Sequence, residues 1–371
     1  METTLQSTNN TKLGLLCTAG LLGLLALIGL GDRLSVLSGG NLPASLISVA
    51  RNRALMTLAD DSNYYETVEK RGLEQVWQFK YSRDFRFFRY APNQTWEKNG
   101  ITTNSLGRVG PEWPKLKPAH TIRIALLGDS LAAGYRVPYQ ETFAPRLEQH
   151  LNQAGSPYPV EVLNFACPGY TLPQVFDTAI EDVRPYGADV YLLELSERSL
   201  YRQWDNQLLQ LTQRGIDPKY DFLRKFLQQA HVSRSDSRVE LHTKLAPYRI
   251  PILRSMLEAL NVEVRGRHAT LVLLLFPAVE PGDLSARRIH AAQGAYEGLN
   301  VPVIDLTDSF DKTSNRQPFL AAPDDPSNLD VHPNGPAFAL ILDDLYRKLQ
   351  AQPDAMAAMT GHEPADAPIT K

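Results

Sequence analysis

Three residues from two distant parts of the chain have the types that a serine nucleophile and its base require. Ser130 lies in a Gly-Asp-Ser tripeptide, and Asp330 and His332 stand two positions apart near the other end of the chain. A serine hydroxyl attacks a carbonyl only when a base takes its proton and a further group orients that base. Side chains at positions i and i+2 of an extended stretch point to the same side, so Asp330 could turn the His332 ring toward Ser130.

Acyl transfer also needs donors for the negative charge that develops on the carbonyl oxygen. Ser130 is expected to begin a helix, where backbone N–H groups are free to bind an anion. Gly169, in the stretch NFACPGYT, offers a second N–H that no side chain shields, and two such donors form an oxyanion hole. Taken singly, each residue also has an ordinary interpretation: the tripeptide can cap a helix, His332 can be a surface residue and Gly169 can form a turn.

The elements that must position these residues follow from an alternation of apolar runs and amphipathic segments. The expected strands cover residues 122–128, 160–166, 188–196, 269–277 and 301–307, and the expected helices cover 141–155, 172–187 and 336–350. Continuous apolar strands that alternate with helices indicate a parallel sheet covered on both faces. Loops at the carboxyl ends of such strands gather in one crevice, and the candidate residues fall in those loops.

Composition limits the classes of partner and cofactor. The 371 residues carry a net charge of −3 without a long basic block, which argues against nucleic acid as the main partner. The chain has two cysteines, Cys17 and Cys167, and we expect no structural disulfide between them. No Cys/His cluster has the spacing of a zinc site, so we expect neither a metal nor a cofactor.

The N-terminal region contains an uncharged apolar run at residues 13–31. As a helix it would be about 28 Å long, close to the hydrocarbon thickness of a bilayer. A cleaved signal peptide and a buried core helix are the alternatives, but the run is long for a signal peptide. We therefore expect a single-pass anchor over residues 1–33. Lys12 before the run and Arg33 and Arg51 after it weakly oppose a catalytic domain outside the cytoplasm.

The rest of the chain divides into segments of different character. Residues 34–120 are expected to form a stalk and a lead-in segment, 121–350 the catalytic domain with a helical insertion at 200–265, and 351–371 a disordered tail. The tail is rich in Ala, Pro, Asp and Met and lacks the apolar content of a core element. Aromatic residues within 61–120 could stack on nucleic-acid bases, but interleaved acidic residues favour a packed lead-in.

From about residue 121 to residue 348 the chain resembles the GDSL/SGNH hydrolases. The stretches LLGDSLAAGY, NFACPGYT and LDVHPNGPAFALI resemble the first, second and last blocks of that family. The resemblance implies Ser130 as nucleophile, Gly169 as oxyanion donor, and Asp330 with His332 as the rest of the triad. It also implies an α/β fold, a flavodoxin-like three-layer sandwich with a mostly parallel five-stranded sheet. TNSLGRVGPE, at residues 103–112, is similar to a lead-in of membrane-anchored bacterial members, which implies an extracytoplasmic catalytic domain.

Two departures from the family pattern bear on the site. The third block usually supplies an Asn from Gly-x-Asn-Asp, whereas this chain has ELSERSL. That stretch is similar to the E-x-x-E-R of polysaccharide O-acetyltransferases of the alginate-acetylation type, and Arg198 could then be a cationic oxyanion donor or form a surface salt bridge. The last block more often reads Asp-x-x-His, so Asp324 and Asp325 are alternatives to Asp330.

The resemblance leads to three functional hypotheses. The first is a membrane-anchored serine esterase that acts on an ester, most simply an acetylated carbohydrate. The second is a polysaccharide O-acetyltransferase that uses the same triad beside a membrane acyltransferase. The third is a catalytically inactive relative that binds glycan. Water or a sugar hydroxyl as the acyl acceptor distinguishes the first two hypotheses.

Overall fold

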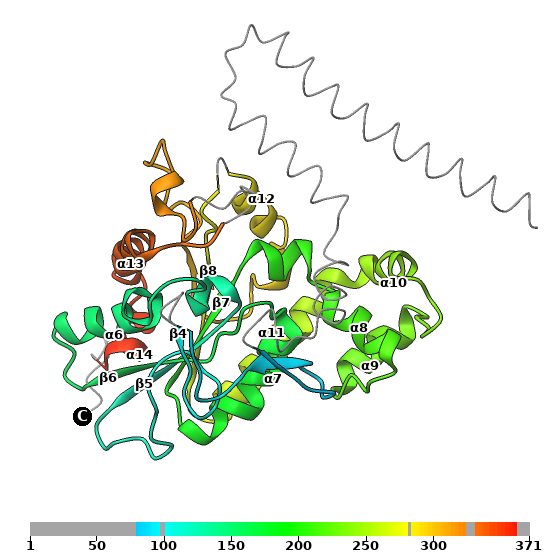
Figure 1. Ribbon diagram of the computed structural model, residues 1–371, viewed down its shortest axis with the longest axis horizontal. Coiled ribbons are helices and arrows are strands. Elements are labelled where there is room, and N and C mark those ends of the chain that lie inside the picture. The colour runs from blue at the N-terminus through cyan, green and yellow to red at the C-terminus, as the bar shows by residue number, and fades with distance from the viewer. Residues whose placement is uncertain (1–78, 97–100, 281–282, 324–330, 362–371) are drawn as a thin grey trace, which may run out of the picture. The chain divides into compact units, whose positions relative to one another are not determined.

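A five-stranded parallel sheet forms the centre of the protein, as the computed structural model shows for residues 79–96, 101–280, 283–323 and 331–361 (Figure 1). Its strands, in spatial order, are β6 (Val160–Asn164), β5 (Ile122–Leu127), β7 (Val190–Leu195), β8 (Thr270–Leu275) and β9 (Val303–Asp305). Every neighbouring pair in this sheet is parallel. The order is that of the flavodoxin-like doubly wound sheet, so the predicted sheet is confirmed.

Helices cover both faces of the sheet. On one face lie α6 (Phe143–Gln153), α13 (Gly335–Leu349) and α14 (Pro353–Thr360), and on the other lie α7 (Leu172–Thr178) and α11 (Arg249–Arg265). Ile124 and Leu126 of β5 are fully buried in one core cluster with Phe143, Phe338 and other residues of the first helix layer. Because strand side chains alternate between faces, Ala125 and Leu127 serve the opposite layer. The strands are mainly apolar because the sheet is covered on both faces.

The remaining helices lie mainly between β7 and β9. They are α5 (Ser130–Ala133), α8 (Asn206–Arg214), α9 (Asp221–Gln229), α10 (Arg238–Leu245) and α12 (Leu284–His290). The predicted insertion at 200–265 needs a correction, because its last helix, α11, packs against β8 and is the crossover helix of the sandwich. Its buried face includes Ile252, Met256 and Leu260, at the four-residue spacing of an apolar helix stripe. The inserted part is therefore α8 to α10.

The prediction of a disordered tail from residue 351 is wrong for its first part. Residues Pro353–Thr360 form α14, whose Ala355 and Met359 side chains are fully buried in the core cluster. The helix begins with proline near its first position, where the missing N–H has no intrahelical acceptor in any case. Small and flexible apolar side chains fill the gap beside β5, so a composition typical of disorder still forms a packed element.

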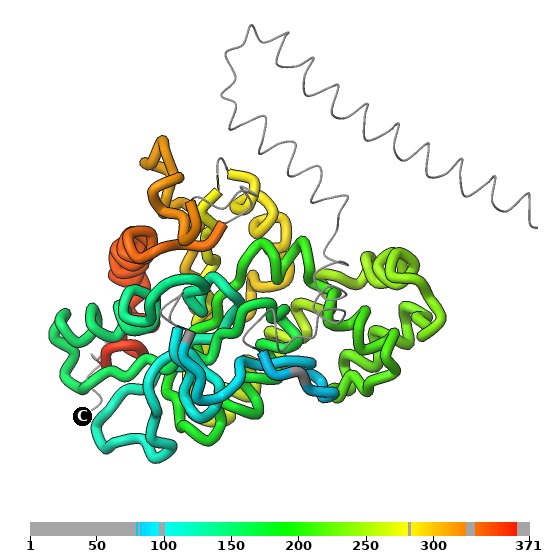
Figure 2. Tube along the Cα trace, in the orientation of Figure 1, coloured from blue at the N-terminus to red at the C-terminus, as the bar shows by residue number. Residues whose placement is uncertain are grey.

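The described part of the lead-in, residues 79–96 and 101–120, packs onto the sandwich. It contains two antiparallel hairpins, β1 (Phe79–Tyr81) with β2 (Phe88–Tyr90) and β3 (Thr95–Trp96) with β4 (Ile101–Thr102), and its tube runs beside the α7 region (Figure 2). Gln174 of α7 donates to the carbonyl oxygen of Arg86 at 2.8 Å, and the Tyr170 hydroxyl donates to that of Phe88 at 2.7 Å. The lead-in aromatic residues Phe79, Phe88 and Tyr90 are buried and therefore belong to a core.

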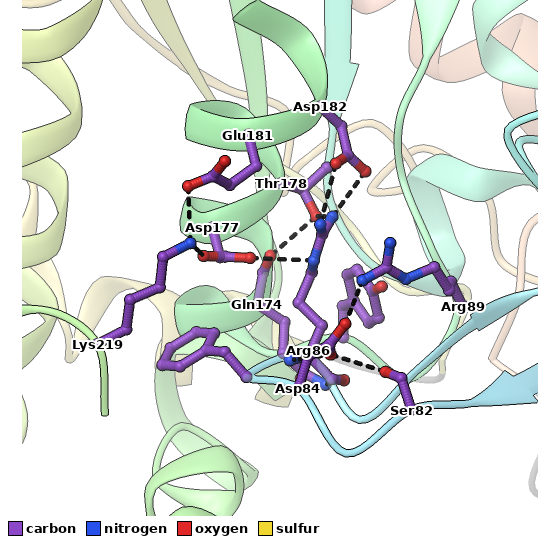
Figure 3. Close-up of polar contacts among 12 residues, drawn as sticks. Ser82, Asp84, Arg86, Arg89, Gln174, Asp177, Thr178, Glu181, Asp182 and Lys219 are labelled. Atoms are coloured by element: carbon purple, nitrogen blue, oxygen red, sulfur yellow. Dashed lines mark hydrogen bonds and ion pairs between the residues drawn. The ribbon is translucent and has the colours of Figure 1, made fainter. Parts of the chain in front are cut away.

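Arg86 joins the lead-in to the α7 layer through buried ion pairs (Figure 3). Its guanidinium binds both carboxylate oxygens of Asp182, at 2.6 and 2.9 Å, and its Nε lies 3.0 Å from Asp177. Burial opposes ionisation of Asp182, but Arg108 and Arg86 outweigh it and hold the pKa of this carboxyl well below its usual range. A bidentate pair of this kind fixes position as well as charge.

We expect Arg86→Met to destabilise the protein by about 3 kcal/mol, because the buried Asp177 carboxylate and the partly buried Asp182 carboxylate each lose an ion-pair partner. Asp177 keeps its ion pair with Lys219, and Asp182 keeps its ion pair with Arg108. Urea unfolding measures the change. Arg89→Met in the same hairpin is the matched control. Arg89 pairs with Asp84, and the two side chains are 34% and 45% exposed. Loss of this pair should lower the free energy of unfolding by less than about 1 kcal/mol. Equal losses for the two variants would contradict the assigned role of Arg86.

Several predicted features lie outside the residues that the structure describes. They are the anchor at 1–33, the part of the stalk up to residue 78, Asp330 with its alternatives Asp324 and Asp325, and the tail from residue 362. Within the described ranges, no helix has the length and hydrophobicity that crossing a bilayer requires.

Candidate active site

Ser130 lies at the carboxyl end of the second strand in the spatial order of the sheet. β5 ends at Leu127, and Ser130 is the first residue of α5 after the Gly128–Asp129 turn. The Asp129 carboxylate caps this helix by accepting the N–H of Leu131 at 2.9 Å. Helix capping and nucleophile position therefore belong to different residues of the tripeptide, so Ser130 keeps its hydroxyl for other contacts.

His332 meets Ser130 across 202 positions of sequence. Its Nε2 lies 2.9 Å from the Ser130 Oγ, a normal hydrogen-bond distance for a hydroxyl and a ring nitrogen. With the proton of the neutral ring on Nδ1, Nε2 accepts from the hydroxyl, which is the geometry of a nucleophile and its general base. The Tyr135 ring lies against the imidazole with a centroid separation of 5.0 Å. The pairing of Ser130 with His332 is thus present in the structure.

The backbone around His332 is held by hydrogen bonds to neighbouring loops. The Ala321 N–H donates to the carbonyl oxygen of His332 at 2.8 Å, and the Val279 N–H donates to that of Val331 at 2.9 Å. Asn334 then caps α13 with its side chain. These contacts fix the approach of the histidine to the sheet edge, which a surface histidine would not need. Asp330 lies outside the described residues, so its role in orienting the ring stays a prediction.

The loop that contains Gly169 lies directly beside the nucleophile turn. The Cys167 N–H donates to the carbonyl oxygen of Gly128 at 3.1 Å, and the Phe165 N–H donates to that of Leu126 at 2.8 Å. Gly169 has a φ of +84°, in the left-handed region that favours glycine. The turn interpretation is therefore correct, and it places the residue in a loop bonded to the nucleophile turn. Donation from its N–H to an oxyanion stays a prediction.

The third block forms a polar turn next to the nucleophile. The Ser196 hydroxyl donates to Asp129 Oδ2 at 2.8 Å. A π-helical turn follows at Arg198–Arg202, and Arg198 Nε donates to the Gln203 side chain. Glu197 forms ion pairs with Arg288 at 2.8 Å and with Arg202 at 3.2 Å. Donation from Arg198 to an oxyanion stays a prediction.

Glu194 is the site residue whose contact sequence reasoning missed. It lies inside the apolar strand β7, is 2% exposed, and accepts the Asp129 N–H on Oε2 at 2.7 Å. A Cβ at Gly128 would lie 2.3 Å from the same oxygen, so the glycine of the tripeptide is required by this close approach. The signal in the sequence is a carboxylate within VYLLEL, since charged residues are almost never fully buried without a structural reason.

Among the described residues, no group of three or more His, Cys, Asp or Glu side chains could hold a metal ion. The site described so far consists of a serine, a histidine, the loop that contains Gly169, the third-block turn and two buried carboxyls. Such an arrangement suits acyl transfer through a covalent serine intermediate.

Comparison with known proteins adds a family assignment. The sequence profile of the GDSL-like lipase/acylhydrolase family matches residues 126–340. The structure is similar to that of a lipase/acylhydrolase from Enterococcus faecalis, at 17% identity and a TM-score of 0.40, over 66% of this chain and 100% of the other. It is also similar to a variant of an acetyl xylan esterase from Geobacillus stearothermophilus, at 14% identity and a TM-score of 0.41, over 64% of this chain and 97% of the other. No curated protein matches the chain.

Proposed function

The chain belongs to the GDSL-like lipase/acylhydrolase family and is an ester-bond hydrolase, and we propose that Ser130 is its nucleophile and His332 its general base. The observation that supports this assignment is the 2.9 Å contact between His332 Nε2 and Ser130 Oγ. Because the two residues are 202 positions apart, only the fold brings them together.

The proposed reaction has two acyl-transfer steps. The Ser130 Oγ attacks the ester carbonyl while His332 Nε2 takes the hydroxyl proton and then donates it to the leaving alcohol. Water, deprotonated by the same nitrogen, attacks the acyl-enzyme and releases the carboxylic acid and the free serine. The N–H groups of Ser130 and Gly169 are the proposed donors to the oxyanion of each tetrahedral intermediate, with Arg198 as a further candidate. Asp330 is the proposed group that orients the imidazole.

For the substrate we propose an acetylated carbohydrate, on the strength of the family blocks in the sequence. The E-x-x-E-R stretch at Glu194–Arg198 favours a second candidate, an O-acetyltransferase in which a sugar hydroxyl replaces water and a membrane acyltransferase supplies the acyl group. The two functions share the acyl-enzyme and differ in its acceptor, so they are separated by following the acyl group.

We expect wild-type protein given p-nitrophenyl acetate to release acetate in the same yield with and without added oligosaccharide, because water is the proposed acceptor. Acetate is measured enzymatically and the oligosaccharides by mass spectrometry, with Ser130→Ala as the control for uncatalysed hydrolysis. Serine-dependent formation of acetylated sugar, at the expense of acetate, would replace the esterase by the transferase.

A further inference from the structure

Glu194 supports the turn that precedes the nucleophile. Its side chain extends from the carboxyl end of β7 beneath the β5–α5 turn, where Oε2 accepts the Asp129 N–H at 2.7 Å. Asp129 is the residue directly before Ser130, and the close approach at Gly128 leaves no room for a side chain there. Glu194 is therefore the buried side chain that accepts the backbone N–H directly before Ser130.

The surroundings of Glu194 contain a second carboxyl, that of Asp129. Asp129 accepts two hydrogen bonds, from the Leu131 N–H and the Ser196 hydroxyl. Within the described ranges, no lysine, arginine or histidine pairs with either carboxyl, and Glu194 Oε1 is buried without a hydrogen-bond partner. Two ionised carboxylates in one dry turn would repel each other strongly.

The pKa of Glu194 shifts in the direction that a neighbouring carboxyl and burial predict. Burial first, and then the neighbouring Asp129 carboxyl, raise the pKa of Glu194 well above its usual range, although hydrogen bonds from the Asp129 N–H and Ser196 oppose the rise. These groups face Glu194 from the nucleophile turn and from the turn after β7. This direction favours the protonated form of Glu194.

We propose that Glu194 is a positioning residue that, as a neutral carboxylic acid, holds the Gly128–Asp129 turn so that Ser130 meets His332. The expected effect on kcat rests on the proposed function, in which Ser130 is the nucleophile and His332 its base. Without an acceptor for the Asp129 N–H, the turn loses its buried support and Ser130 leaves the geometry in which its Oγ faces the base. Misplacement of a reacting group by about 1 Å costs on the order of 100-fold in rate.

Two variants separate a neutral acceptor from an ionised one. Glu194→Gln keeps the shape and a carbonyl oxygen for the Asp129 N–H, and we expect its kcat to stay within about 3-fold of wild type, since one neutral acceptor replaces another. Glu194→Met keeps the volume without an acceptor, and we expect kcat for p-nitrophenyl acetate to fall on the order of 100-fold with KM little changed. Glu148→Met is the matched control, because Glu148 also accepts a buried strand N–H, that of Val162 at 2.8 Å, away from the site.

Each of the other kinetic outcomes overturns a stated part of the proposal. A Glu194→Met variant as active as Glu148→Met would show that the turn needs no support from Glu194. A Glu194→Gln variant as impaired as Glu194→Met would show that an ionised carboxylate is required. Thermal unfolding of all variants identifies any loss of kcat that only reflects a smaller folded fraction.

An infrared measurement tests the protonation state without reference to catalysis. The difference spectrum between wild type and Glu194→Gln at pH 7 should contain the C=O stretch of a protonated carboxylic acid, because the proton resides on Glu194. A spectrum with carboxylate bands alone would contradict the proposal. If the acid band is present but wild type and Ser130→Ala hydrolyse the ester at the same rate, the proposed function fails while the protonation of Glu194 stands.

Discussion

Replacing Ser130 with alanine is expected to lower kcat for ester hydrolysis on the order of 10⁴- to 10⁶-fold, because no other group of the site can form the acyl-enzyme. The substitution removes one oxygen atom from a residue that is 8% exposed and whose backbone already has helical geometry. The cap on α5 comes from Asp129 and is retained. Stability should therefore change by less than about 1 kcal/mol, since the lost contact is a single hydrogen bond.

The Ser130 prediction is measured as kcat and KM with p-nitrophenyl acetate, together with a urea unfolding curve. Ser156→Ala is the matched control, because the Ser156 hydroxyl also makes ordered contacts, to the carbonyl oxygens of Tyr158 and Thr360. Ser156 precedes β6 and so lies at the edge of the sheet opposite the nucleophile. If Ser130→Ala kept activity near that of Ser156→Ala, the serine mechanism would be wrong.

Replacing His332 with alanine is the second change with a very large expected effect. The Ser130 hydroxyl then has no base at 2.9 Å to take its proton, and the leaving alcohol has no acid to protonate it. Because the serine and histidine of a triad act as one unit, the loss should approach that of Ser130→Ala, on the order of 10⁴- to 10⁶-fold in kcat. The double variant should be little worse than either single variant.

A second histidine provides the control for His332. His290 also pairs with an aspartate, Asp305, at 2.7 Å, on an exposed part of the surface. Replacing His290 with alanine should leave kcat within about 2-fold of wild type, because exposed pairs contribute little to structure. Equal losses in the two variants, or additive losses in the double variant of Ser130 and His332, would contradict the role of His332 as the base.

The sheet was predictable because its strands are buried on both faces. A strand such as Ile122–Leu127 is apolar at nearly every position, and a turn or helix signal follows each such run. Elements on the periphery were harder to predict. The helix at Pro353–Thr360 has the composition of a disordered tail, and only its contacts with the core cluster explain its order. The sequence predicts the crossover helix Arg249–Arg265 as part of an insertion, because the helical stretch before it carries many charges.

The candidate site was predictable where chemistry requires particular residue types. Ser130 and His332 follow from a nucleophile and a base at the carboxyl ends of predicted elements, and the structure brings them together. The contact of Glu194 with the Asp129 N–H could not be predicted in the same way, because strand alternation does not show how far a long side chain reaches under a neighbouring turn. Spacing alone also does not single out the partner of the His332 ring, since three aspartates stand within the eight positions before it, at 324, 325 and 330.

The most direct test of the account is covalent labelling of the folded wild-type protein with a fluorophosphonate, followed by intact mass and peptide mapping. A serine activated by a neighbouring imidazole reacts with such a probe, whereas an ordinary surface serine does not. The account predicts one adduct for each chain, located on Ser130, and no adduct in Ser130→Ala. An unlabelled wild-type protein, or an adduct on a different serine, would contradict the assignment of Ser130 as the nucleophile.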